Sequence, residues 1–150
     1  MADNPMITLL GSVDLFAGLS KKVLKRIVES GHELDFAPGA EVVRAGEPVA
    51  GFREFSPKGV EMHVVRSGRA VVRVGGQEVA TLGPGSYFGE LALIDGQPRS
   101  ADVVAGDEGL STFALPRWSF KELIATHPEI AVPMLRVVVA QLRRAEAAAR

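Results

Sequence analysis

The sequence contains no cysteine, no excess of either charge and no long apolar run. Without cysteine, the chain can form neither a disulfide nor a thiolate zinc site, and it has no cysteine nucleophile. The 17 basic and 18 acidic residues give a formal net charge of −1, so no overall positive field attracts nucleic acid or anionic lipid. No apolar run reaches the ~20 residues that a membrane span requires, and the N-terminus lacks the basic lead of a signal peptide. We therefore expect a cytoplasmic protein without direct contacts to membrane or nucleic acid.

Length and composition predict one globular domain over residues 1–150. Hydrophobic residues make up 47% of the chain and charged residues 23%, the ordinary mixture for such a domain. A chain of 150 residues buries enough surface on folding to need no metal or disulfide for stability.

Glycine is concentrated in the middle of the chain, where 14 of the 16 glycines lie between Gly31 and Gly109. Glycine marks turns and is poor in helix interiors, so residues 32–117 are predicted to form strands and both ends to form helices. Short segments rich in β-branched residues lie between the turn signals, as in a small sandwich or barrel. These signals occur at 38–39, 46–48, 67–68, 75–76 and 83–85.

Three helices are predicted outside this region. Ser20 can cap a helix over Lys21–Glu29, and Ser119 can cap another over Phe120–Thr126. A capping box over 126–129 would open the last helix, which continues to about residue 148 and which Pro133 bends or starts. The predicted fold is therefore α+β: an antiparallel β-roll, jelly-roll-like, between an N-terminal helical segment over 1–31 and two C-terminal helices over 118–150.

The connection from Val49 to Glu61 is longer than most links between strands. Phe52 and Phe55 are large apolar groups for a loop. They either pack onto the roll as a small loop core, or cover a ligand or contact a partner.

The segment 83–105 carries the chemistry. Gly89 is predicted to open a very short helix over Glu90–Leu93, which 95–98 breaks before Arg99. A helix start presents unpaired N–H groups to an anion, the guanidinium of Arg99 can bind a phosphate with two hydrogen bonds, and the Glu90 carboxylate can accept from a pair of sugar hydroxyls. Together they fit a ribose phosphate. Alternatively, Glu90 and Arg99 only pair with each other across the turn.

The order of residues from Phe88 to Ala101 resembles the phosphate-binding cassette of cyclic nucleotide-binding domains. It is similar to the cassettes of cAMP-dependent protein kinase regulatory subunits and of bacterial cAMP receptor proteins. Further resemblance to this family lies in the N-terminal segment 13–20, the turns at 36–39 and 44–48, and the exit at 115–117 and 127–129.

The resemblance implies a role for each matching residue. Arg99 would pair with the exocyclic phosphate, and Glu90 would accept from the ribose 2′-hydroxyl. Gly89 would allow close approach of the ligand, and Val79 and Phe88 would form an apolar wall. The backbone N–H groups around Leu91, Ala92 and Ser100 would complete the phosphate cradle, which ends at Ala101.

Two departures from the family pattern concern the base. The loop 49–61 is longer than usual, and Ala145 and Glu146 stand where bacterial activators carry hydroxyl side chains that reach the base. The cradle itself contacts only ribose and phosphate, and Ser100 occurs beside the arginine in relatives of both preferences. We expect cAMP as the ligand, with cGMP as the alternative.

Enzyme functions find little support in the sequence. His32, His63 and His127 are scattered and lack neighbouring ligands at metal-site spacing, and no serine nucleophile motif occurs. Arg143, Arg144 and Arg150 are charges on a helix face rather than a DNA-recognition module.

Two functions stay open: a non-catalytic module that binds a cyclic nucleotide and signals to an unidentified protein partner, or a ligand-free scaffold for protein association. From Ile130 to Leu142 only Arg136 and Gln141 are polar, which predicts a homodimer through the last helix.

Overall fold

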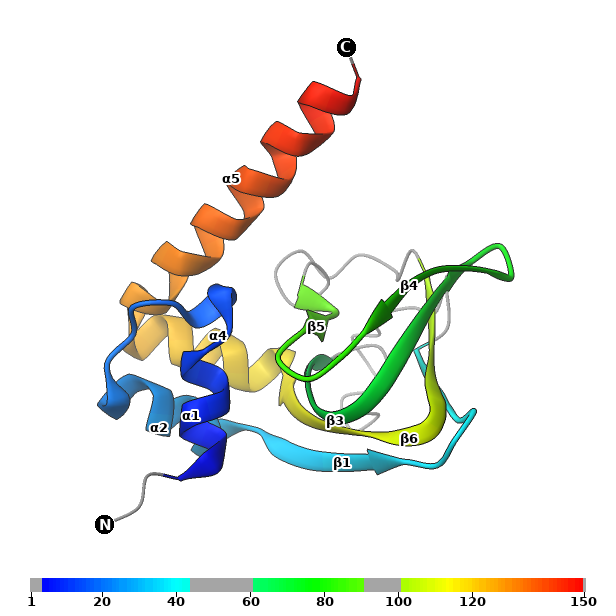
Figure 1. The fold of residues 1–150 in the computed structure, drawn as a ribbon. Helices are drawn as coiled ribbons and strands as arrows, with labels where there is room; N and C mark the ends of the chain where they lie inside the picture. The colour runs from blue at the N-terminus through cyan, green and yellow to red at the C-terminus, as the bar shows by residue number, and fades with distance from the viewer. Residues whose placement is uncertain (1–3, 44–60, 91–100, 150) are drawn as a thin grey trace.

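The computed structural model describes residues 4–43, 61–90 and 101–149, in which helices from both ends of the chain gather at one end of a curled antiparallel sheet (Figure 1). The last helix projects away from the sheet. The helical elements are α1 (Pro5–Gly11), the 3-10 turn η1 (Asp14–Phe16), α2 (Lys21–Ser30), α4 (Arg117–Thr126), the 3-10 turn η2 (Pro128–Ile130) and α5 (Ala131–Ala148). The strands are β1 (His32–Phe36), β2 (Glu41–Val43), β3 (Glu61–Val74), β4 (Gln77–Leu82), β5 (Tyr87–Phe88) and β6 (Asp102–Pro116).

The α+β fold class is confirmed by this arrangement. The sheet has the order β1-β6-β3-β4, with β2 paired to β6 and β5 paired to β3, and every pairing is antiparallel. The turns predicted at 38–39, 75–76 and 83–85 are found, whereas the one at 46–48 and the loop with Phe52 and Phe55 lie outside the described residues.

The predicted turn at Ser67–Gly68 is wrong, because β3 runs through it without a break. Gly68 (φ 76°) lies opposite Leu110, and Ala70 lies opposite Ala105, so residues 106–109 of β6 bulge out against Arg69 alone. A bulge of this kind bends both strands, and Figure 1 shows β3 and β6 curling together. The glycine at 68 therefore marks a bend within a long strand rather than its end.

The apolar interior forms two clusters on opposite faces of the β3–β6 ladder, since the neighbours Val64 and Val65 belong to different clusters. The helical core joins the helices to one end of the ladder between β3 and β6, and the roll core lies inside the curl. The buried strand residues of the helical core are Met62, Val64, Phe113 and Leu115. The roll core consists of Val42, Val43, Val65, Ala70, Phe88, Val103, Ala105 and Leu110.

At the N-terminus the helix predicted over Lys21–Glu29 is confirmed. The hydroxyl of Ser20 accepts from the N–H of Val23 at 3.2 Å, as an N-cap does. The structure adds α1, which the sequence analysis did not predict. Its signals were local: Pro5 occupies the first turn, and the Asn4 side chain accepts from the N–H of Met6 at 2.8 Å.

At the C-terminus two predicted helix starts are wrong. The helix α4 begins at Arg117 because β6 leads straight into it through Pro116, and Ser119 is buried inside its first turn. Thr126 does not cap the last helix, since its hydroxyl donates back to the carbonyl of Glu122 at 3.0 Å. Pro133 starts α5 rather than bending it: it lies in the first turn, where helix N–H groups have no intrahelical partner.

Within the described residues no single helix combines the length and apolar composition to cross a bilayer, although α4 and 128–148 pass that test as a pair bent by 113°.

The bend between β3 and β6 depends on the absence of a side chain at Gly68. A Cβ atom there would collide with the backbone carbonyl of Gly109. Gly39 has nearly the same φ, 78°, but a Cβ atom there would meet open space. We expect Gly39→Ala to cost about 1–2 kcal/mol of unfolding free energy from backbone strain, and Gly68→Ala at least about 1 kcal/mol more from the collision. Urea denaturation of both variants measures the difference, and equal losses would contradict the close approach.

Candidate functional site

The predicted site residues fall partly inside the described chain. Phe88, Gly89, Glu90, Ala101 and Val79 are described. The remaining predicted ligand residues, Leu91, Ala92, Arg99 and Ser100, lie outside the described residues, and their roles stay predictions.

The strand β5 lies between the two apolar clusters. Its residues pair with β3, Tyr87 opposite Val64 and Phe88 opposite His63. Because successive side chains of a strand point to opposite faces, Phe88 joins the roll core while Tyr87 packs against the helical core. This short strand fixes the position of the segment that follows it.

Gly89 and Glu90 follow β5 directly. Gly89 has φ 86°, in the region that favours glycine, and the chain turns there into a helix whose first residue is the half-buried Glu90. Glu90 thus follows the buried Phe88 by two residues, at the end of β5. An ionised carboxylate at this place can accept hydrogen bonds from ligand hydroxyls.

The ring of His63 stacks on the ring of Phe88, a contact that was not predicted from the sequence. The two rings stack with centroids 4.8 Å apart and planes 13° apart, and Phe36 meets the His63 ring edge-on. His63 is 4% exposed, and its Nδ1 lies 3.0 Å from the hydroxyl of Thr112. No local pattern marks this histidine, because its partners come from β1, β5 and β6.

Val79 and Ala101 have different surroundings from Phe88. Val79 is 58% exposed and lies in a bulge of β4, since Ala80 is opposite Val72 and Glu78 is opposite Arg73. It is not part of the roll core. Ala101 is half-buried and immediately precedes β6. Among the described site residues, Phe88, Gly89 and Glu90 are consecutive, and Val79 is exposed and outside the roll core that contains Phe88.

The other two histidines pair with carboxylates. His32 Nε2 lies 2.6 Å from the carboxylate of the buried Glu61, and His127 Nδ1 lies 3.6 Å from Glu129. Among the residues that the structure describes, no three His, Asp or Glu side chains form a group that could hold a metal ion.

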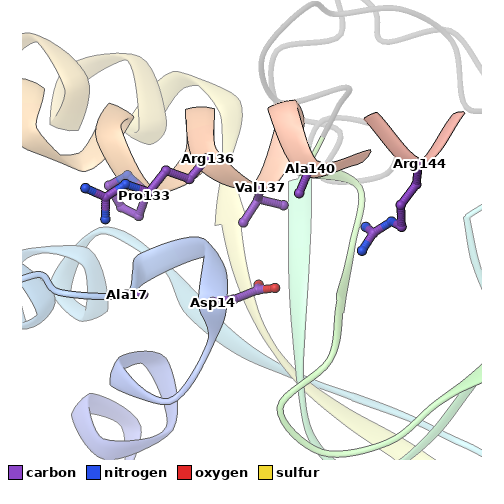
Figure 2. Close-up of a pocket in the computed structure, with 7 residues that line it drawn as sticks. All are labelled: Asp14, Ala17, Pro133, Arg136, Val137, Ala140 and Arg144. Carbon is purple, nitrogen blue, oxygen red and sulfur yellow. The ribbon is translucent and has the colours of Figure 1, made fainter. Parts of the chain in front are cut away.

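Tyr87 connects β5 to the N-terminal segment and to the last helix. Its side chain is hydrogen-bonded to Asp14 of η1. Asp14 also lines a hollow of about 200 Å³ between η1 and α5, together with Val137, Ala140 and Arg144 of α5. Figure 2 shows the Asp14 side chain below Val137, with Arg144 reaching from α5 toward the same space.

The Tyr87 hydroxyl is also an unusually weak acid. Burial, the hydrogen bond to Asp14 and the negative charges of Asp14 and Glu90 raise the pKa of Tyr87 well above its usual value, with Arg144 opposing them. All three causes favour the neutral hydroxyl, which donates to Asp14.

The raised pKa predicts how stability depends on pH. The folded protein keeps the Tyr87 proton where the unfolded chain releases it, near pH 10. The stabilisation is therefore fully present below about pH 10 and is lost as the pH rises further. We expect wild type to lose more unfolding free energy than Tyr87→Phe between about pH 8 and about pH 11. Because Tyr87 is the one tyrosine of the chain, tyrosinate absorbance follows it directly, and its ionisation near pH 10 in the folded protein would contradict the prediction.

Comparison with known proteins gives one family. The family model described as cyclic nucleotide-binding domain matches residues 41–127. A cyclic nucleotide-gated potassium channel of Mesorhizobium japonicum is 37% identical over 82% of this chain and 31% of its own length. A cAMP-dependent protein kinase regulatory subunit of Debaryomyces hansenii is 32% identical over 77% of this chain and 24% of its own length.

The fold is also that of solved relatives. The regulatory domain of Toxoplasma gondii PKA, crystallised with cAMP, matches with a TM-score of 0.71 and 30% identity, over 91% of this chain and 48% of that one. The chain spans about a quarter to a third of the length of the curated relatives named above.

Proposed function

The chain belongs to the cyclic nucleotide-binding domain family, and from that premise we propose that it binds cAMP as a non-catalytic regulatory module and signals to a protein partner. The observation that carries the proposal is the position of Glu90, directly after Gly89 at φ 86° and two residues after the buried Phe88. A carboxylate held at the edge of an apolar wall is suited to the hydroxyls of a ribose.

The ligand contacts follow the family's cassette. Arg99 neutralises the exocyclic phosphate, the backbone N–H groups around Leu91, Ala92 and Ser100 cradle it, and Glu90 accepts from the 2′-hydroxyl. Phe88, stacked on His63, forms the wall beside the ligand. The solved Toxoplasma relative, crystallised with cAMP, supports cAMP as the ligand.

Substitutions at the two charged residues test this proposal by calorimetry. Arg99→Ala should cost about 2–5 kcal/mol of cAMP binding, because the phosphate loses its charged partner in a partly desolvated site. Glu90→Gln should cost less, about 1.5–3 kcal/mol, because its hydrogen bonds go to neutral hydroxyls. Its penalty should shrink with 2′-deoxy-cAMP.

Arg69→Ala is the matched control. Arg69 precedes Ala70 of the roll core on β3, so its side chain is on the opposite face of the sheet. It should leave binding unchanged. If Glu90 and Arg99 only pair with each other, cAMP will give no heat with wild type, and unchanged cAMP affinity in Arg99→Ala would refute the proposed role of Arg99.

Association through α5 is a second part of the proposal. Val132, Leu135, Val139 and Leu142 are 45–61% exposed and lie at spacings of three and four residues along one side of α5, the spacing of a two-helix seam. The opposite side packs onto the helical core through Met134 and Val137. The exposed apolar stripe also favours the alternative function, a scaffold for protein association without ligand.

The dimer has its own test. Leu135→Glu places a charge in the middle of the stripe and should give a monomer near 15.9 kDa by light scattering, where wild type has twice that mass. Gln141→Glu adds the same charge to another side of α5 and should leave the dimer intact. A monomeric wild type at tens of micromolar would contradict association through α5.

A further inference from the structure

Two consecutive side chains of β5 reach opposite interiors of the molecule. Phe88 is fixed in the roll core by its stack on His63, and Tyr87 packs on the helical core. A displacement of the chain at Gly89 and Glu90 therefore acts on both cores through β5. Packed interiors transmit such displacements because they are close-packed.

Tyr87 has a polar connection in addition to its packing. Its hydroxyl is hydrogen-bonded to Asp14, and Asp14 lies in η1, the N-terminal turn that contacts α5. The Asp14 carboxylate shares a hollow with Val137, Ala140 and Arg144 (Figure 2). The side chain of Asp14 thus lies between β5 and the last helix.

Two charged groups also affect the Tyr87 hydroxyl. The negative charge of Glu90, the proposed ribose contact, favours its neutral form, and the positive charge of Arg144 on α5 opposes this effect. Glu90, Asp14 and Arg144 therefore all act on Tyr87, and Asp14 and Arg144 are far from it in the sequence. These groups extend from the proposed ribose contact to the helix that carries the exposed apolar stripe.

We infer that Tyr87 is a positioning residue whose hydrogen bond to Asp14 makes η1 and α5 follow ligand occupancy at Glu90. The inference rests on the proposed cAMP binding. When a ribose engages Glu90, the position and effective charge of that carboxylate change beside Tyr87, and the hydrogen bond carries the change to Asp14 and α5. Without the Tyr87 hydroxyl, binding and the position of α5 become independent.

The test measures binding and the position of α5 separately in the full chain. Because the sequence has no cysteine, Gln77→Cys on β4 and Ala147→Cys on α5 provide two exposed sites for spin labels. Pulsed electron paramagnetic resonance then gives the distance between the label on β4 and the label on α5, with and without cAMP. Calorimetry gives the affinity for cAMP.

We expect cAMP to shift this distance in the otherwise wild-type protein. Tyr87→Phe and Asp14→Leu should reduce the shift to less than about half, while cAMP affinity stays within about fivefold, the low end of usual coupling factors. Asp14→Leu keeps the branched shape of the side chain but cannot accept a hydrogen bond, so it tests the inference independently of the packing of Tyr87.

Ser111→Ala is the matched control, because the Ser111 hydroxyl also donates to an aspartate, Asp35, on the pair β1–β6. It should keep the full shift. A shift that is intact in Tyr87→Phe and Asp14→Leu, or a wild type that binds cAMP without any shift, overturns the inference alone. A wild type that does not bind cAMP overturns the proposed function and this inference with it.

Discussion

The close approach of β3 to β6 at Gly68 and Gly109 is the constraint on which the rest of the structure depends. Both residues have positive φ, and a Cβ atom at Gly68 would collide with the Gly109 carbonyl. The bend that they permit curls one long ladder so that its two faces have different partners. The face with Met62 and Leu115 packs against the helices, and the face with Val65, Ala70 and Val103 encloses the roll core. Without the bend, the two strands would form a flatter sheet.

The two-residue strand β5 contributes one side chain to each of the two apolar clusters. Because successive side chains of a strand point to opposite faces, Phe88 reaches the roll core and Tyr87 reaches the helical core. Each is supported from far along the chain: Thr112 on β6 contacts the His63 ring that stacks on Phe88, and Asp14 near the N-terminus accepts a hydrogen bond from Tyr87. The site and the last helix are therefore attached to the same short segment, which is why a binding event and a helix position can be linked physically.

Local signals predicted much of the fold. Ser20 caps α2 as expected, the glycine turns at 75–76 and 83–85 are present, and the α+β class follows from the distribution of glycine along the chain. The predicted turn and helix starts were wrong where packing between distant segments overrode a local signal. Gly68 resembles a turn residue but permits a bend, because the Gly109 carbonyl of β6, 41 positions further along the chain, approaches it closely. Ser119 and Thr126 have capping chemistry, yet β6 carries the chain directly into α4, and the helix end at His127 leaves Thr126 inside it.

The sequence by itself predicted which residues make up the candidate site. The order Phe88-Gly89-Glu90 and the position of Arg99 depend on local chemistry, since a glycine at a turn, a carboxylate after it and a guanidinium nearby are residues of one segment. Only the tertiary structure decided what surrounds that segment. The stack of His63 on Phe88, the hydrogen bond from Tyr87 to Asp14 and the exposure of Val79 depend on strand register and on the bulge in β4. Register is set by pairing between distant segments, and a shift of one residue turns each side chain to the other face of the sheet, so no local pattern could have predicted these contacts.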